Sequence, residues 1–79
     1  MPPMLILTSL KELLYDTPQQ TASQLVELLE AKGYVVGVGD VLTVLTRQAS
    51  SFERAYGQPP TWGLTAGARL NVEIARQRQ

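Results

Sequence analysis

The stretch that decides the fold is FERAYGQPPTWGLT, residues 52–65. The larger side chains from Phe52 to Tyr56 occupy every second position, which is the two-residue period of a β-strand. Residues 57–60 contain a glycine and two adjacent prolines, which favour a turn and cannot extend the hydrogen-bond ladder of a sheet. Residues 61–65 predict a second short strand. The stretch therefore predicts a β-hairpin over about residues 52–65, with a stiff, proline-rich tip.

Upstream of the hairpin, the first predicted helix ends before Pro18, because proline disfavours helical backbone at the residue that precedes it. The helix begins either at Ser9, where Glu12 would complete a capping box, or nearer Met4, just after the first two prolines. Its apolar positions recur at helical spacing: Ile6, Leu10, Leu13 and Leu14.

The second predicted helix covers about residues 22–32 and has clear signals at both ends. Thr21 can cap its start, and Gln24 stands three residues on as the reciprocal partner of a capping box. Gly33 is typical of the residue that ends a helix in the left-handed backbone region. The apolar face of this helix is formed by Ala22, Leu25, Val26, Leu28 and Leu29.

A third helix is predicted after a short extended link, with Asp40 as its N-cap. Its core-facing stripe is predicted to be Val41, Leu42, Leu45 and Ala49. Its outer face would then carry Thr43, Val44, Arg47 and Ser50. Because this helix directly precedes the hairpin, we expect its outer face and the hairpin to form one contact surface.

A final helix of about residues 66–77 follows the hairpin, with Thr65 as its cap. Leu70 and Ile74 lie one turn apart on this helix, and Val72 is a further candidate for the same apolar stripe. The stripe either packs on the first helix or joins two copies of the chain into a homodimer.

The order of the predicted elements is three helices, two strands and a final helix. This order is that of a winged helix-turn-helix domain of the α+β class, in which residues 57–60 form the tip of the wing. A chain of 79 residues is enough for one domain, so we expect a single winged-helix domain over residues 1–79.

Composition excludes several classes of function. The chain has no histidine and no cysteine, which removes the usual general base, the commonest zinc ligand and any thiolate. The carboxylates show no spacing typical of an acid–base pair, so we expect no enzyme activity, metal, cofactor or small-molecule substrate. No apolar run reaches the roughly 18 residues of a membrane span. The lack of cysteine and of a basic leader segment favours a cytoplasmic protein.

The wing string G-x-P-P-x-W of residues 57–62 resembles the wing of the Z-alpha domains, which bind left-handed nucleic acid. In that family the wing prolines and tryptophan pack against the phosphate backbone. The longer pattern over about residues 8–70 is similar to winged helices at the N-termini of restriction enzymes and in HARE-type modules. The asparagine and tyrosine positions of the Z-alpha recognition helix hold Asp40 and Val44 here. The resemblance therefore implies a winged-helix shape, and it carries over as wing residues only Pro59, Pro60 and Trp62.

Arg47 on the third helix and Arg54 on the first wing strand are the best candidate phosphate ligands, because a guanidinium group pairs with phosphate through a rigid fork. The alternative is a solvated face on which Arg54 pairs with Glu53 or Asp40. Trp62 either touches a ligand at the wing or covers the base of the hairpin against the third helix. The complete candidate nucleic-acid surface is Thr43, Arg47, Ser50, Arg54, Gln58, Pro59, Pro60 and Trp62.

Two functions remain open from the sequence. One is a small DNA-binding, transcription-regulatory protein whose third helix lies along the major groove and whose wing lies along the backbone. The other is a protein-interaction or dimerisation module of the same shape. Seven basic residues balance seven acidic ones, and this net charge of zero favours the second function, because phosphate neutralisation drives nucleic-acid binding.

Overall fold

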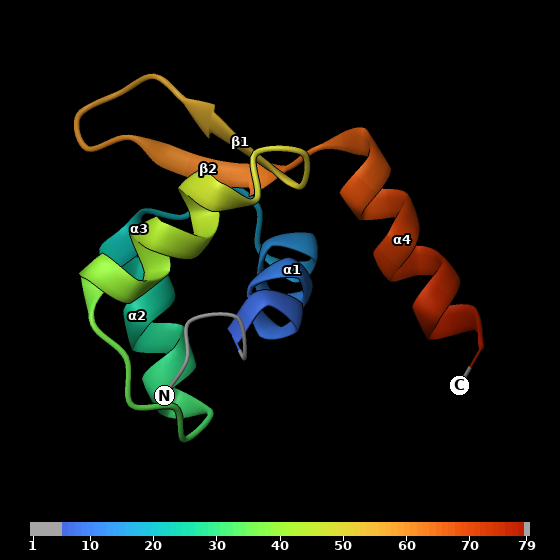
Figure 1. The fold of residues 1–79 in the computed structure, drawn as a ribbon, viewed down its shortest axis with the longest axis horizontal. Coiled ribbons are helices and arrows are strands. Elements are labelled where there is room, and N and C mark those ends of the chain that lie inside the picture. Colours follow the sequence, from blue (N-terminus) through green and yellow to red (C-terminus); the bar gives the residue numbers. More distant parts are fainter. Residues whose placement is uncertain (1–5, 79) are drawn as a thin grey trace.

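The computed structural model describes residues 6–78, and within them four helices and one antiparallel hairpin form an α+β fold with the predicted winged-helix layout (Figure 1). The elements are α1 (Leu7–Asp16), α2 (Ala22–Ala31), α3 (Val38–Arg47), β1 (Phe52–Ala55), β2 (Thr61–Leu64) and α4 (Ala66–Gln77). None of the helices in this part of the chain is long and apolar enough to cross a membrane.

The predicted hairpin is confirmed, since β1 and β2 pair antiparallel along their full length. On its other side β2 pairs with the segment between α1 and α2. There the Trp62 N–H donates to the Gln20 carbonyl at 2.8 Å, and the Gln20 N–H donates to the Trp62 carbonyl at 3.2 Å. This isolated β-bridge, which the sequence did not predict, pairs with the second edge of β2 and ties the wing to the helices.

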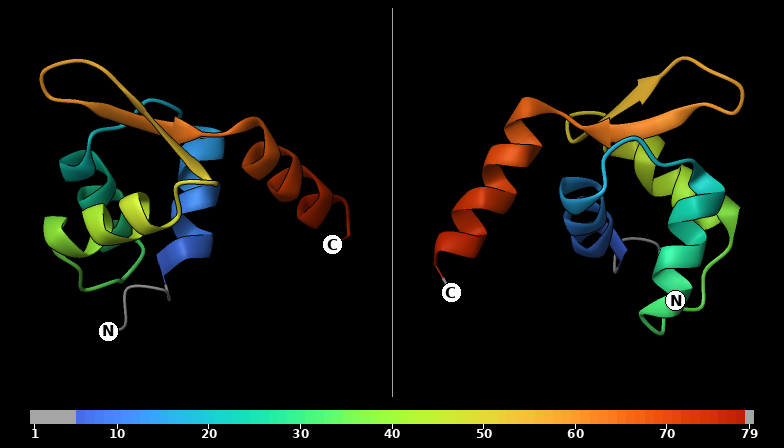
Figure 2. Two further views of the ribbon diagram at one scale, coloured as in Figure 1. Left: turned by 45° about the horizontal axis from the view of Figure 1, so that its top comes forward. Right: turned by 180° about the vertical axis from the view of Figure 1, so that it is seen from behind.

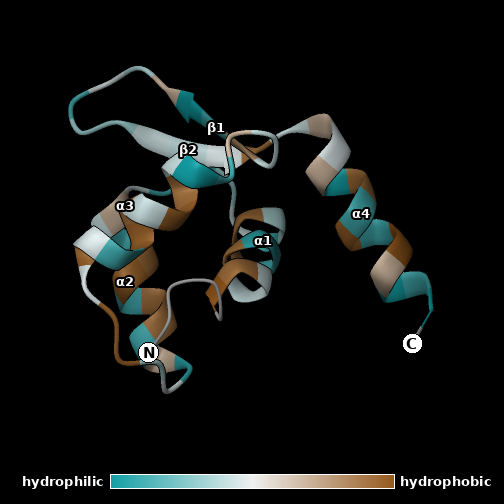
Figure 3. Cartoon of the chain, in the orientation of Figure 1, coloured by the Kyte–Doolittle hydropathy of each residue, from teal (hydrophilic) through white to brown (hydrophobic). Residues whose placement is uncertain are grey.

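The core lies where α1, α2 and α3 meet the hairpin, and α4 covers α1 from the opposite side (Figure 1, Figure 2). Figure 3 shows hydrophobic residues along the first three helices and polar ones toward the end of α4. Burial of apolar side chains is the main force that holds such a small fold together. The buried cluster consists of Ile6, Leu10, Leu14, Leu25, Leu29, Val41, Val44, Leu45, Phe52, Trp62, Leu64, Ala68 and Val72.

The capping predictions for α2 and α4 are confirmed. Thr21 Oγ1 accepts from the Gln24 N–H at 3.1 Å, and Gln24 Oε1 accepts from the Thr21 N–H at 2.8 Å. Gly33 adopts a φ of +97° just after α2, the left-handed conformation that glycine adopts with least strain. Thr65 Oγ1 accepts from the Ala68 N–H at 3.3 Å, and α4 covers the predicted range.

The predicted capping box of Ser9 and Glu12 is wrong. α1 begins at Leu7, so Ser9 lies inside the helix, where it is buried. Its Oγ is 2.7 Å from the hydroxyl oxygen of Tyr34, which follows α2. A buried hydroxyl needs a hydrogen-bond partner, and this distant residue supplies it. The alternative start near Met4 lies outside the described residues.

α3 begins earlier than predicted and faces the core with a different edge. It starts at Val38, so Asp40 is the third residue of the helix rather than its cap, and Asp40 Oδ2 accepts from the Gly37 N–H at 3.1 Å. Val44, predicted on the outer face, is buried. Leu42, predicted in the core stripe, is 38% exposed. Both corrections follow from the way α3 is rotated about its own axis to meet the core.

Candidate nucleic-acid interface

The wing, α3 and the N-terminus of α2 surround one groove of about 280 Å³. The loop between β1 and β2 projects beyond the helices in each view (Figure 1, Figure 2). The groove is lined by Thr21, Ala22, Ser23, Leu42, Pro59, Pro60 and Trp62. The third helix and the wing therefore share one surface, with an apolar floor contributed by the leucine, the prolines and the tryptophan.

α3 exposes both apolar side chains and hydroxyl groups. Val38 and Leu42 lie one turn apart and are 40% and 38% exposed. The Thr43 hydroxyl donates to the Gly39 carbonyl at 2.8 Å, and the Thr46 hydroxyl donates to the Leu42 carbonyl at 2.8 Å. Both hydroxyl hydrogens are thus used inside the helix, which leaves the threonine oxygens free only as acceptors.

Arg47 and Arg54 are exposed, and neither forms an ion pair in the part of the chain that the structure describes. The alternative in which Arg54 pairs with Glu53 or Asp40 is therefore not observed. Arg54 stands opposite Trp62 in the hairpin register, so these two side chains lie on the same face of the wing. Arg54 consequently projects from the same face of the wing as Trp62, which packs into the core. Arg47 is the last residue of α3.

The tip of the wing is exposed to solvent. Gln58 and Pro59 are exposed, and Pro60 is half-buried beside the groove. The first strand ends at Ala55, one residue earlier than predicted, and the next residue, Tyr56, is 99% exposed. An exposed aromatic side chain at the start of the wing loop is a candidate contact that the sequence analysis missed, although an aromatic directly before a turn is the signal that could have found it.

Two residues of the predicted contact surface have structural roles. Trp62 is only 7% exposed and belongs to the core, as one of the two sequence alternatives expected. The expected position of Ser50 on the third helix is wrong, because α3 ends at Arg47. Ser50 and Ala49 lie in the turn that follows, where the Ser50 carbonyl accepts from the Thr65 hydroxyl at 2.8 Å.

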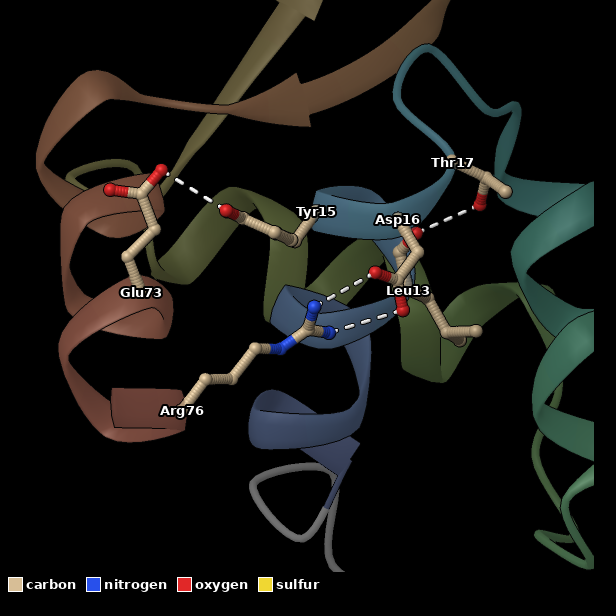
Figure 4. A network of polar contacts seen from close by, with 6 residues as sticks. All are labelled: Leu13, Tyr15, Asp16, Thr17, Glu73 and Arg76. Atoms are coloured by element: carbon tan, nitrogen blue, oxygen red, sulfur yellow. Dashed lines mark hydrogen bonds and ion pairs between the residues drawn. The ribbon is translucent and has the colours of Figure 1, made fainter. Parts of the chain in front are cut away.

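Between α1 and α4 a polar network fastens the final helix to the first (Figure 4). The Tyr15 hydroxyl donates to Glu73 Oε1 at 3.0 Å, and this hydrogen bond raises the pKa of Tyr15. The Arg76 guanidinium donates to both carboxylate oxygens of Asp16 at 3.0 and 3.1 Å and lies 4.6 Å from the centre of the Tyr15 ring. Its hydrogen bonds lower the pKa of Asp16. The inner side of α4 is thereby fixed against the first helix.

The outer side of α4 carries the predicted interface residues. Leu70 and Ile74 are 54% and 40% exposed. Val72 does not belong to this stripe, since it is buried on the side of α4 that meets the core. The packing of α4 on α1 therefore uses other side chains and leaves Leu70 and Ile74 available.

Residues 6–78 contain no group of three or more acidic side chains placed to hold a metal ion. Comparison with protein-family models, curated proteins and solved structures finds no match for this chain. The winged-helix layout accordingly rests on the element order, the hairpin and the Gln20–Trp62 bridge.

Proposed function

We propose that this protein binds duplex DNA through α3 and the wing, in a transcription-regulatory role. The observation that carries the proposal is the exposure of Arg47 on α3 and of Arg54 on the wing, neither of which has a carboxylate partner within residues 6–78. An unpaired guanidinium keeps its full fork of donors for phosphate. The wing string of residues 57–62, which resembles that of the Z-alpha domains, supports the same ligand class.

Two phosphate contacts predict weak binding that depends on salt. On B-DNA the logarithm of the binding constant falls with the logarithm of salt concentration with a slope of about −0.9 per neutralised phosphate. Two arginines therefore predict a loss of affinity of about 12-fold between about 50 and 200 mM salt. Asp40 and Glu53 place negative charge on the same two elements, which opposes binding and keeps the affinity low.

The test is a titration of labelled duplex DNA at these two salt concentrations. Arg47→Ala and Arg54→Ala should each weaken binding at low salt and reduce the salt dependence from about 12-fold to about 3.5-fold. Arg78→Ala is the matched control, because it removes the same charge from the end of α4, away from the wing.

An unchanged salt dependence in both Arg47→Ala and Arg54→Ala would show that these arginines do not contact phosphate. A chain that binds no duplex even at low salt would contradict the proposal as a whole. Circular dichroism of each variant checks that the fold is retained.

A second candidate function is association with protein, and the outer side of α4 favours it. Leu70 and Ile74 expose apolar surface one turn apart on α4, whose C-terminal end points away from the wing, so two copies could meet there with both wings free. Sedimentation velocity of the wild type and of Leu70→Glu tests this. A concentration-dependent dimer that the glutamate abolishes supports self-association, and a monomer at all concentrations contradicts it.

A further inference from the structure

We infer that α3 recognises thymine through its 5-methyl group, so that the protein prefers thymine-containing DNA to duplexes that lack this methyl. The inference rests on the proposed function and names the base chemistry that the same surface selects. It follows from the side chains that α3 exposes and could offer to the edge of a base pair.

The middle of α3 offers few free hydrogen-bond donors to a base. The hydroxyl hydrogens of Thr43 and Thr46 are donated to carbonyls of the same helix. The Asp40 carboxylate accepts from the backbone at the start of the helix. Arg47 is the last residue of α3, at the end of the surface rather than its centre. The usual bidentate recognition of guanine or adenine therefore has no arginine, asparagine or glutamine in the middle of this helix.

Apolar contact is available at the start and in the middle of α3. Val38 and Leu42 are each about two-fifths exposed, and Leu42 continues into the groove beside Pro59 and Pro60. In the major groove thymine alone among the four bases presents a methyl group. The other bases present polar atoms there, which would lose water against valine or leucine without gaining a hydrogen bond. The exposed Arg47 and Arg54 supply positive charge for the flanking phosphates, which matches DNA better than an uncharged partner.

The experiment compares two duplexes of equal length at about 50 mM salt, one of alternating dA-dT and one of alternating dA-dU. Deoxyuridine pairs like thymidine and differs only by the missing methyl. The wild type should bind the thymine duplex more tightly, by about fourfold for each methyl that it buries. Leu42→Ala and Val38→Ala should each reduce this ratio toward one.

Val35→Ala is the matched control, because Val35 is 86% exposed and lies before α3, so the preference should survive its truncation. Thermal unfolding of each variant shows whether the fold is intact. Equal binding of both duplexes by the wild type would overturn the inference and leave the proposed function standing. Binding of neither duplex would overturn both, and the apolar side of α3 would then be a surface for protein.

Discussion

Loss of the hydrogen bond between Ser9 and Tyr34 should lower the free energy of unfolding more when Tyr34 is truncated than when Ser9 is truncated. It joins α1 to the segment that leads into α3, and its oxygens are 2.7 Å apart. Ser9 is only 9% exposed, whereas Tyr34 is half-buried. Tyr34→Phe would therefore leave a buried hydroxyl without a partner, at a cost of about 1.5 kcal/mol in the free energy of unfolding.

Truncating the other partner should cost less. Ser9→Ala loses about 1 kcal/mol for the hydrogen bond but gains about 0.5 kcal/mol of helix propensity, and water can still reach the tyrosine hydroxyl. The double variant leaves no unpaired group, so its loss of stability should be smaller than the sum of the two single losses by about 1 kcal/mol. From most to least stable, the expected order is wild type, Ser9→Ala and Tyr34→Phe.

Urea unfolding followed by fluorescence measures these differences, because the single tryptophan, Trp62, is buried in the fold. Tyr56→Phe is the matched control, since Tyr56 is 99% exposed and should change stability by less than about 0.5 kcal/mol. Additive costs, or a larger loss from Ser9→Ala than from Tyr34→Phe, would refute the reasoning.

Two further predictions concern backbone conformation and pH. Gly33→Ala should lower the free energy of unfolding by about 1 kcal/mol, because φ is +97° there and alanine is strained in that conformation. Gly67→Ala on α4 should raise it by about 0.5–1 kcal/mol, because alanine has the higher helix propensity. Open space surrounds both positions, so a change of the same sign for both variants in urea unfolding would contradict the argument. The Arg76 guanidinium lowers the pKa of Asp16 in the folded protein. The ion pair therefore contributes fully to stability above the unfolded pKa of Asp16, about 4, and this contribution is lost as the pH falls through the folded pKa. The stability difference between wild type and Asp16→Asn should accordingly shrink as the pH is lowered from about 5 to about 2, and a constant difference would speak against this pair.

The candidate site was only partly predictable, and α3 shows why. Val41 and Leu45 mark the centre of its buried face, and at 100° per residue Leu42 and Val44 each lie about 80° from that centre, on opposite sides. Periodicity alone therefore cannot tell which of the two is buried. Packing against the rest of the core selects Val44, which leaves Leu42 in the groove beside Pro59 and Pro60.

By itself the sequence determined the features that depend on neighbours in the chain: the order of the elements, the hairpin, and the caps at Thr21 and Thr65. These signals act over a few residues, through backbone preference and short side-chain hydrogen bonds. Only the tertiary structure decided the rotation of α3, the burial of Ser9 and the pairing of Gln20 with Trp62, because each depends on groups that are distant in sequence and meet only when the core closes.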